Sequence, residues 1–236
     1  MTGRIICLVG THPRSTNWPL EMEPGVKFWA ANEAISKPYP GGLGRAFQLH
    51  PRNWREAERR FLNGGELPDG CDPDCFGRSA AHVEALRACQ VPVYCLEKWA
   101  DISNAVVYPR SAVVQTLSVP TPDGELYATS TFGYMMALAL FEHITQSPAI
   151  AEIRLAGMEL AIGTARERSW EWPNLAFYLG MAHGLGIKIT LPPGGTSILN
   201  APLYAVDGPF LPEDPDHWWG AAGPLRLDED GRMARL

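Results

Sequence analysis

Short apolar runs that stop at glycine or at polar residues recur along the chain. The first spans residues 5–9 without a break and ends at Gly10. Comparable runs lie at 26–33, 46–50, 91–96, 105–109, 151–159 and 186–192. Continuous apolar runs of this length are typical of strands buried on both faces, as in parallel sheets. The pattern therefore predicts a sheet covered on both sides.

Segments with helical spacing of apolar residues lie between these runs. They cover 53–61, 79–89, 127–141 and 173–184. Strands that alternate with helices predict an α/β fold. We expect a Rossmann-like, mostly parallel sheet with helices on both faces, forming a single domain over residues 1–208. A mobile lid is expected at 163–172, and a Pro/Trp-rich C-terminal extension at 209–236 that ends in a loose tail from 228.

Composition narrows the function classes. The chain has 236 residues and a net charge of −6, which argues against strong general binding of nucleic acid. No apolar run reaches the roughly 20 residues of a membrane helix, and the start does not read as a signal peptide. Five scattered cysteines favour reduced thiols. These features predict a cytoplasmic protein without a membrane partner; a homo-oligomer is left open.

The loop after the first strand carries the first candidate chemistry. Gly10 is followed by Thr11, Arg14 and Ser15, which offer two hydroxyls and a positive charge. Ligands of open α/β sheets bind at the carboxyl ends of the strands. The loop therefore predicts a site for a nucleotide or its phosphates, with Gly10 admitting close approach; the alternative is an ordinary turn. It matches neither the dinucleotide-binding glycine pattern nor a Walker loop.

Two further residues lie at predicted strand ends. Asn32 has both a donor and an acceptor with which to read a base or a ribose, but the same residue type also caps helices. His50 is placed for acid–base work or for a phosphate contact, with a structural role as the alternative.

The start of the long apolar helix and a pair of cysteines raise two further options. Hydroxyls at residues 129–131 precede that helix and predict an anion site at its N-terminus, or simple capping. Cys71 and Cys75, with His82 farther on, have a spacing that zinc sites use, but no fourth ligand is evident. We predict no metal site.

Several motifs, taken in order, resemble a known family. They are Val9-Gly10-Thr11-x-Pro13-x-Ser15, Trp29-x-x-Asn32, Thr129-Ser130-Thr131-x-Gly133-Tyr134-Met135 and Ile153-x-Leu155-x-Gly157-Met158-Glu159. This order resembles the bacterial sialyltransferases, and also the related hydroxymethylpterin pyrophosphokinase family and uncharacterised tailed-phage proteins. The phage proteins are the most similar, since they too have a strand ending in His near residue 50. The resemblance covers roughly residues 4–200.

The resemblance implies a Rossmann-like sheet that holds a nucleotide. Carried across, it implies nucleotide contacts from Gly10, Thr11, Pro13, Ser15, Asn32, Ser130 and Thr131. From the same segments we add Arg14, Gly133, Gly157, Met158 and Glu159 as nucleotide-binding candidates. The chain departs from the family at three places. It has Thr11-His12 where the family has Asn-Gly, and Glu159 where the family has Asp. Near Ser169 it lacks the catalytic histidine of the family. His50 and Glu171 are the candidate catalytic residues in its place.

These inferences predict a glycosyltransferase-like protein that binds a nucleotide-sugar and transfers the sugar without a metal. We predict no cofactor, because the nucleotide-sugar is the substrate. One alternative is a phage protein that sequesters or senses a nucleotide without catalysis, in the host cytoplasm; the missing histidine favours it. A second alternative is an ATP-dependent pyrophosphokinase, and a third is a purely structural role.

Overall fold

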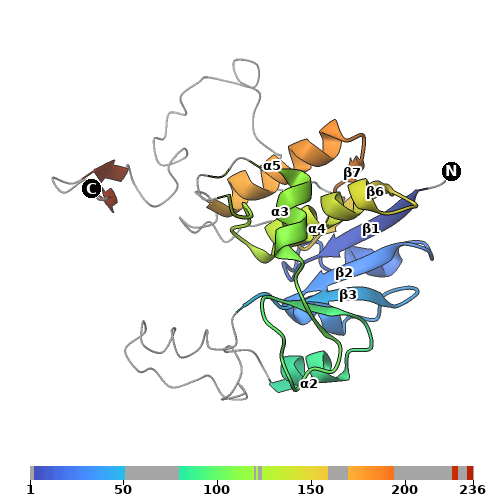
Figure 1. Ribbon diagram of the computed structural model, residues 1–236. Coiled ribbons are helices and arrows are strands. Elements are labelled where there is room, and N and C mark those ends of the chain that lie inside the picture. Colours follow the sequence, from blue (N-terminus) through green and yellow to red (C-terminus); the bar gives the residue numbers. More distant parts are fainter. Residues whose placement is uncertain are drawn as a thin grey trace, which may run out of the picture.

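The computed structural model describes residues 3–50, 80–119, 121, 124–158 and 170–193, together with the backbone of 225–227 and 233–235. A parallel sheet runs through its centre (Figure 1). Its strands are β1 (Arg4–Val9), β2 (Lys27–Ala31), β3 (Leu43–Phe47), β4 (Val93–Cys95), β5 (Ala105–Val107), β6 (Ile150–Ala156) and β7 (Lys188–Thr190). Every neighbouring pair is parallel. The predicted α/β, Rossmann-like fold is confirmed.

Helices cover both faces of this sheet (Figure 1). One face carries α3 (Arg110–Leu117), α4 (Thr131–Thr145) and α5 (Trp172–Gly184). The other face carries α2 (Ala80–Ala88) and the short 3-10 helices η1 (Trp18–Glu21) and η2 (Asn32–Ser36). The predicted helices at 79–89, 127–141 and 173–184 correspond to α2, α4 and α5. The predicted helix at 53–61 lies outside the described residues.

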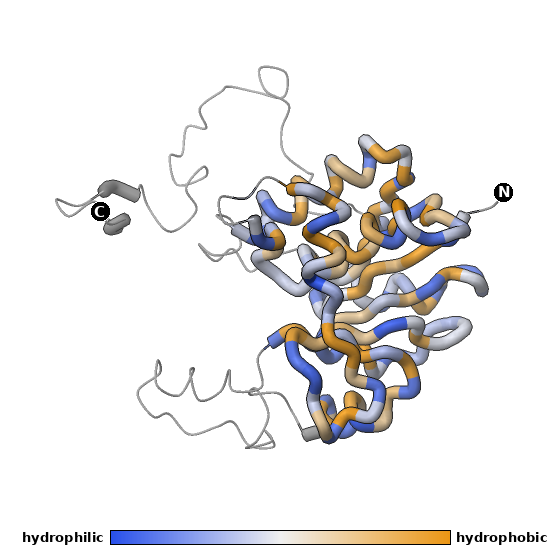
Figure 2. The backbone as a smooth tube through the Cα atoms, viewed as in Figure 1, coloured by the Kyte–Doolittle hydropathy of each residue, from blue (hydrophilic) through white to orange (hydrophobic). Residues whose placement is uncertain are grey.

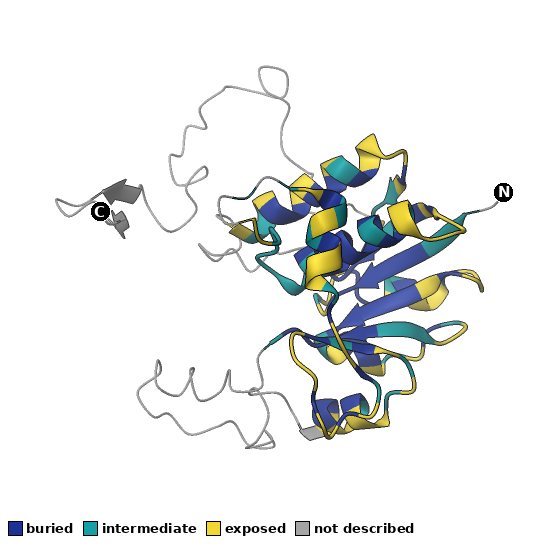
Figure 3. Ribbon diagram, viewed as in Figure 1, coloured by how far each residue is buried: buried dark blue, intermediate teal, exposed yellow. Residues whose placement is uncertain are grey.

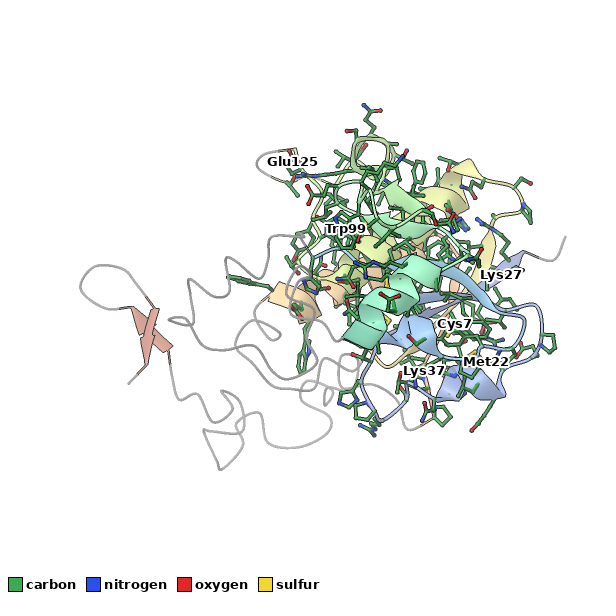
Figure 4. All side chains as sticks on the ribbon, turned by 90° about the horizontal axis from the view of Figure 1, so that it is seen from below. Cys7, Met22, Lys27, Lys37, Trp99 and Glu125 are labelled. Atoms are coloured by element: carbon green, nitrogen blue, oxygen red, sulfur yellow. The ribbon has the colours of Figure 1, made fainter. Side chains whose placement is uncertain are left out.

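The central strands are apolar throughout because both of their faces are covered. Ile6 and Leu8 of β1 pack into the core beneath α4 and α5, whereas Cys7 and Val9 pack into the core on the opposite face. Figure 2 shows β1 coloured as hydrophobic, and Figure 3 shows most of β1 and β2 as buried. In Figure 4, Cys7 lies near Met22 and far from Glu125. The hydrophobic pattern thus fixes a three-layer architecture.

The third strand differs from its predicted position. It spans Leu43–Phe47 rather than 46–50. Pairing with β2 begins at Leu43, although a glycine and Arg45 interrupt the apolar pattern. Arg45 fits the buried sheet because its guanidinium lies 4.3 Å from the centre of the Trp29 ring and pairs with Glu142. His50 consequently lies three residues beyond the strand.

The C-terminal and lid predictions have mixed outcomes. A loose tail was predicted at 228–236, but part of it forms a strand, so that prediction is wrong there. This strand, β9 (Met233–Arg235), pairs antiparallel with β8 (Leu225–Leu227). Residues 163–169 of the predicted lid lie outside the described residues, and Trp172 belongs to α5. The predicted domain limit at 208 also lies outside them and stays a prediction.

An ion-pair network on the face opposite α4 makes stability depend on pH. Arg154 of β6 donates to both carboxylate oxygens of Glu23, at 2.9 and 2.7 Å. These hydrogen bonds lower the pKa of Glu23 to about 2. The folded-state pKa lies below the unfolded value of about 4.3, so the stabilisation is present above that pH and is lost as the pH falls towards 2.

We therefore expect the free energy of unfolding to fall between pH 5 and pH 2, and to fall less steeply in an Arg154→Met variant. Urea unfolding at a series of pH values measures both curves. Lys27→Met, which removes an exposed lysine at the start of β2, is the control and should follow the wild type. Parallel curves for Arg154→Met and the wild type would show that this ion pair does not contribute.

Candidate functional site

The strand order reverses between β1 and β6. From β1 the chain adds β2, β3, β4 and β5 on one side, whereas β6 and β7 lie on the other side. The loops after β1 and β6 therefore leave the sheet in opposite directions, and in such sheets ligands bind at this point of reversal. Gly10 follows β1 and Gly157 follows β6. The sequence-predicted site residues that the structure describes in these two loops lie together at the carboxyl edge of the sheet.

Hydrogen bonds join these two loops directly. The N–H of Gly10 donates to the carbonyl of Ala156 at 2.7 Å, and the N–H of His12 donates to the carbonyl of Gly157 at 3.1 Å. The Ser15 hydroxyl accepts from the N–H of Gly157 at 2.7 Å. Ser15 is buried in this position. The hydroxyl that we predicted to bind a phosphate is thus hydrogen-bonded to the loop after β6.

Glycine is required at both loops because the backbones touch. A Cβ atom at Gly10 would lie 2.2 Å from the carbonyl oxygen of Gly157 and 2.7 Å from the Phe132 ring. Gly157 has a φ of 64°, and a Cβ atom there would lie 2.4 Å from the Gly10 oxygen. The close approach that the sequence predicts for a ligand at Gly10 is thus made by Gly157 and Phe132. Met158, the next residue, is buried in the core.

The remaining residues of the first loop face outwards. Thr11, Pro13 and Arg14 are exposed at the carboxyl edge, beyond the hydrogen bonds that close the base of the loop. The N–H of Arg14 lies 3.3 Å from the Nδ1 atom of His12. Arg14 therefore adds a positively charged side chain to this edge of the sheet, and a guanidinium is a group that binds anions.

Helix α4 begins beside this loop, since Phe132 packs on Gly10. Ser130 is its N-cap, and the Ser130 hydroxyl accepts from the N–H of Gly133 at 3.2 Å. The predicted cap is confirmed. The N–H groups of Thr131 and Phe132 have no acceptor within the helix, because they belong to its first turn. The helix start therefore presents donors and the positive end of its dipole beside the first loop.

A buried asparagine that we did not predict from the sequence is hydrogen-bonded to the segment that precedes α4. Asn174 of α5 is fully buried, accepts from the N–H of Thr129 at 3.2 Å and donates to the carbonyl of Tyr127 at 2.8 Å. The Tyr178 hydroxyl donates to the same carbonyl at 2.7 Å, and burial raises the pKa of Tyr178, which keeps it a donor. The only sequence signal is an amide among the apolar positions of α5.

We expect Asn174→Ala to lower the free energy of unfolding by about 2 kcal/mol, because it removes two hydrogen bonds and leaves the N–H of Thr129 without its acceptor. Urea unfolding measures this change. Asn17→Ala removes an exposed amide that accepts from Lys37 and should change stability by less than about 0.5 kcal/mol. Equal effects of the two substitutions would contradict the role assigned to Asn174.

Two polar residues follow the neighbouring strands β2 and β3. Asn32 has a φ of 52°, and the N-cap position of η2 is Ala31, without a side-chain cap. The capping alternative for Asn32 is therefore wrong. Within the described residues its Oδ1 atom is buried without a hydrogen-bond partner. Gln48, which the sequence reasoning missed, is fully buried, and its Oε1 atom lies 2.9 Å from Nε2 of His82.

The two candidate catalytic residues lie at different elements. His50 follows β3, and three strand spacings, about 14 Å, separate β3 from β6 in the sheet. Glu171 directly precedes α5 and follows Trp170, whose carbonyl accepts from the Thr129 hydroxyl at 2.9 Å. Glu171 is thereby tied to the segment that leads into α4. Glu159 lies outside the described residues.

The predictions about metals and membranes can be compared only with the described part of the chain. It holds no group of three or more His, Cys, Asp or Glu side chains that could bind a metal ion. The Cys71 and Cys75 pair lies outside the described residues. Three Asp-x-Asp sequences, whose carboxylates could also bind a metal, lie outside them as well, at 72–74, 214–216 and 228–230. Among the described helices, none is both long and apolar enough to cross a membrane.

Comparison of the chain with models of protein families, with curated proteins and with solved structures gave no match. The resemblance to sialyltransferases and to phage proteins therefore stays a prediction.

Proposed function

We propose that this protein binds a nucleotide-sugar at the carboxyl edge of its sheet and transfers the sugar without a metal. The observation that carries the proposal is the reversal of strand order between β1 and β6. The exposed residues of the first loop and the start of α4 lie together at this edge. The transfer step rests in addition on the resemblance described above.

The phosphates would lie against the start of α4. The N–H groups of Thr131 and Phe132 and the helix dipole favour an anion there. Arg14 contributes a positive side chain on the neighbouring loop. These groups would also stabilise the charge that develops on the phosphate when the sugar leaves.

Transfer requires a base that takes the proton of the acceptor hydroxyl. We assign this role to Glu171, because its neighbour Trp170 is hydrogen-bonded to Thr129 just before α4. His50 is the alternative base, positioned after β3. Binding without catalysis is the second candidate function. It is favoured by the internal use of Ser15, whose hydroxyl accepts from the backbone of Gly157.

A thermal-shift experiment tests nucleotide binding. A ligand at about 100 times its dissociation constant adds about 2.7 kcal/mol to the free energy of unfolding. For a chain of this size this raises the melting temperature by about 5–10 °C. The panel comprises nucleoside mono- and diphosphates, ATP and nucleotide-sugars. No shift with any of them would overturn the proposal.

Turnover separates transfer from binding alone. We expect the purified protein to hydrolyse its preferred nucleotide-sugar equally well with and without a chelator. We further expect Glu171→Gln to lower the rate about 100-fold while keeping the thermal shift. A shift without hydrolysis supports the binding function, and loss of activity with chelator would indicate a metal. Release of AMP from ATP would indicate pyrophosphate transfer instead.

A further inference from the structure

Two polar atoms at the ends of β2 and β3 are buried without a hydrogen-bond partner in the described part of the chain. They are Oδ1 of Asn32 and Nε2 of Gln48. Buried polar groups are almost always hydrogen-bonded, so such atoms require an explanation. The register pairs Ala31 with Phe47, the last residues of β2 and β3, so Asn32 and Gln48 directly follow a paired position on adjacent strands. Adjacent strands lie about 4.8 Å apart, which makes these residues neighbours.

The contact between Gln48 and His82 sets the polarity of this pair. The Oε1 atom of Gln48 lies 2.9 Å from Nε2 of His82 on α2, and both side chains are buried. The amide oxygen is thus engaged with His82, which leaves the amide N–H₂ as a donor. Oδ1 of Asn32 is an acceptor. An acceptor and a donor without partners therefore follow two adjacent strands at the carboxyl edge.

We propose that Asn32 and Gln48 form the nucleobase subsite of the nucleotide site, an inference that rests on the function proposed above. Every nucleobase has neighbouring donors and acceptors on its edges. Asn32 Oδ1 would accept from a base N–H, and Gln48 Nε2 would donate to a base oxygen or ring nitrogen. An amide oxygen repels phosphate, so this pair selects the uncharged base rather than the anionic end of the ligand.

The location of the pair agrees with the length of a nucleotide. The strands β2 and β3 are the first and second neighbours of β1, so this pair lies about 5–10 Å along the edge from the loop after β1. A nucleotide with its phosphate at that loop and at the start of α4 would extend its base towards β2 and β3. The base and phosphate subsites then use different strands of one edge.

The test compares ligands with and without a base. Dissociation constants are measured by calorimetry for uridine, cytidine, adenosine and guanosine monophosphates and for ribose 5-phosphate. We expect the wild type to bind at least one nucleotide 20-fold or more tightly than ribose 5-phosphate. Asn32→Gly, which tolerates the positive φ, and Gln48→Met, which keeps the side-chain length, should each reduce this preference about tenfold. Their affinity for ribose 5-phosphate should stay within twofold.

The controls separate this inference from the proposed function. Gln90→Met makes the same change at an exposed glutamine at the end of α2 and should keep the full preference. If both site variants keep the preference, the subsite is wrong while nucleotide binding stands. If both variants weaken the binding of ribose 5-phosphate as much as the binding of the nucleotide, the pair does not select the base and the inference is overturned. If the wild type binds no nucleotide, the proposed function fails and the subsite with it. If Gln48→Met does not fold, the dissociation constants of Asn32→Gly alone decide whether the subsite is correct.

Discussion

Gly10→Ala is expected to lower the free energy of unfolding by about 3 kcal/mol in the absence of any ligand. The added methyl group would lie 2.2 Å from the carbonyl oxygen of Gly157 and 2.7 Å from the Phe132 ring. The nearer of these atoms belongs to backbone in the β1–β6 hydrogen-bond pattern, so it cannot turn aside as a flexible side chain would. The strands or the start of α4 must shift instead. Urea unfolding with a linear extrapolation measures the loss.

Gly180→Ala is the matched control. Gly180 lies within α5, and no atom lies within 4 Å of the position that its Cβ would take. Alanine is the better helix former, so this variant should be more stable by about 0.5–1 kcal/mol. If Gly10→Ala were as stable as the wild type and lost only nucleotide affinity, the glycine would serve ligand approach rather than packing.

Glu142→Gln is expected to lower the free energy of unfolding by about 3 kcal/mol. The Glu142 side chain is 2% exposed and pairs with Arg4 of β1 and with Arg45 of β3. Its Oε2 atom lies 2.9 Å from Nη1 of Arg4. Neutralising this carboxylate leaves two partly buried guanidinium groups close together without a counter-charge. The same substitution keeps the size of the side chain, so packing contributes little to the loss.

An exposed glutamate supplies the comparison for this prediction. Glu84 of α2 is 71% exposed and pairs with Arg87 at 2.8 Å. Exposed pairs of this kind contribute about 0.2–1 kcal/mol, so Glu84→Gln should have a correspondingly small effect. Equal effects of Glu84→Gln and Glu142→Gln in urea unfolding would refute the buried ion-pair cluster as a stabilising element.

The sequence predicted the sheet well because burial on both faces leaves a strong signal. The run at 5–9 is apolar at every position since alternate residues enter different cores. The cap at Ser130 was also predictable, because capping depends on residues close in sequence. The position of β3 was predicted three residues too late, because Arg45 interrupts the apolar run. Arg45 can lie in the sheet only because it stacks on Trp29 and pairs with Glu142.

Residues of the site were harder to assign than strands. Gly10 was expected to admit a ligand, whereas in the structure the atoms that approach it are those of Gly157 and Phe132, which lie far from it in the sequence. Asn174 and Gln48 were missed because their partners, Tyr127 and His82, lie far along the chain. Buried polar residues of this kind acquire a role only through tertiary contacts, which the local pattern of hydrophobic residues does not contain.

Amide hydrogen exchange, measured with and without a saturating nucleotide, shows whether the ligand binds where the strand order reverses. We expect slower exchange at residues 11, 12 and 14, at 32–33 and at 131–132, which lie at the carboxyl edge, and unchanged exchange at the opposite edge, at 25–27 and 149–150. Protection confined to the opposite edge, or no protection anywhere, would contradict a nucleotide site where the strand order reverses.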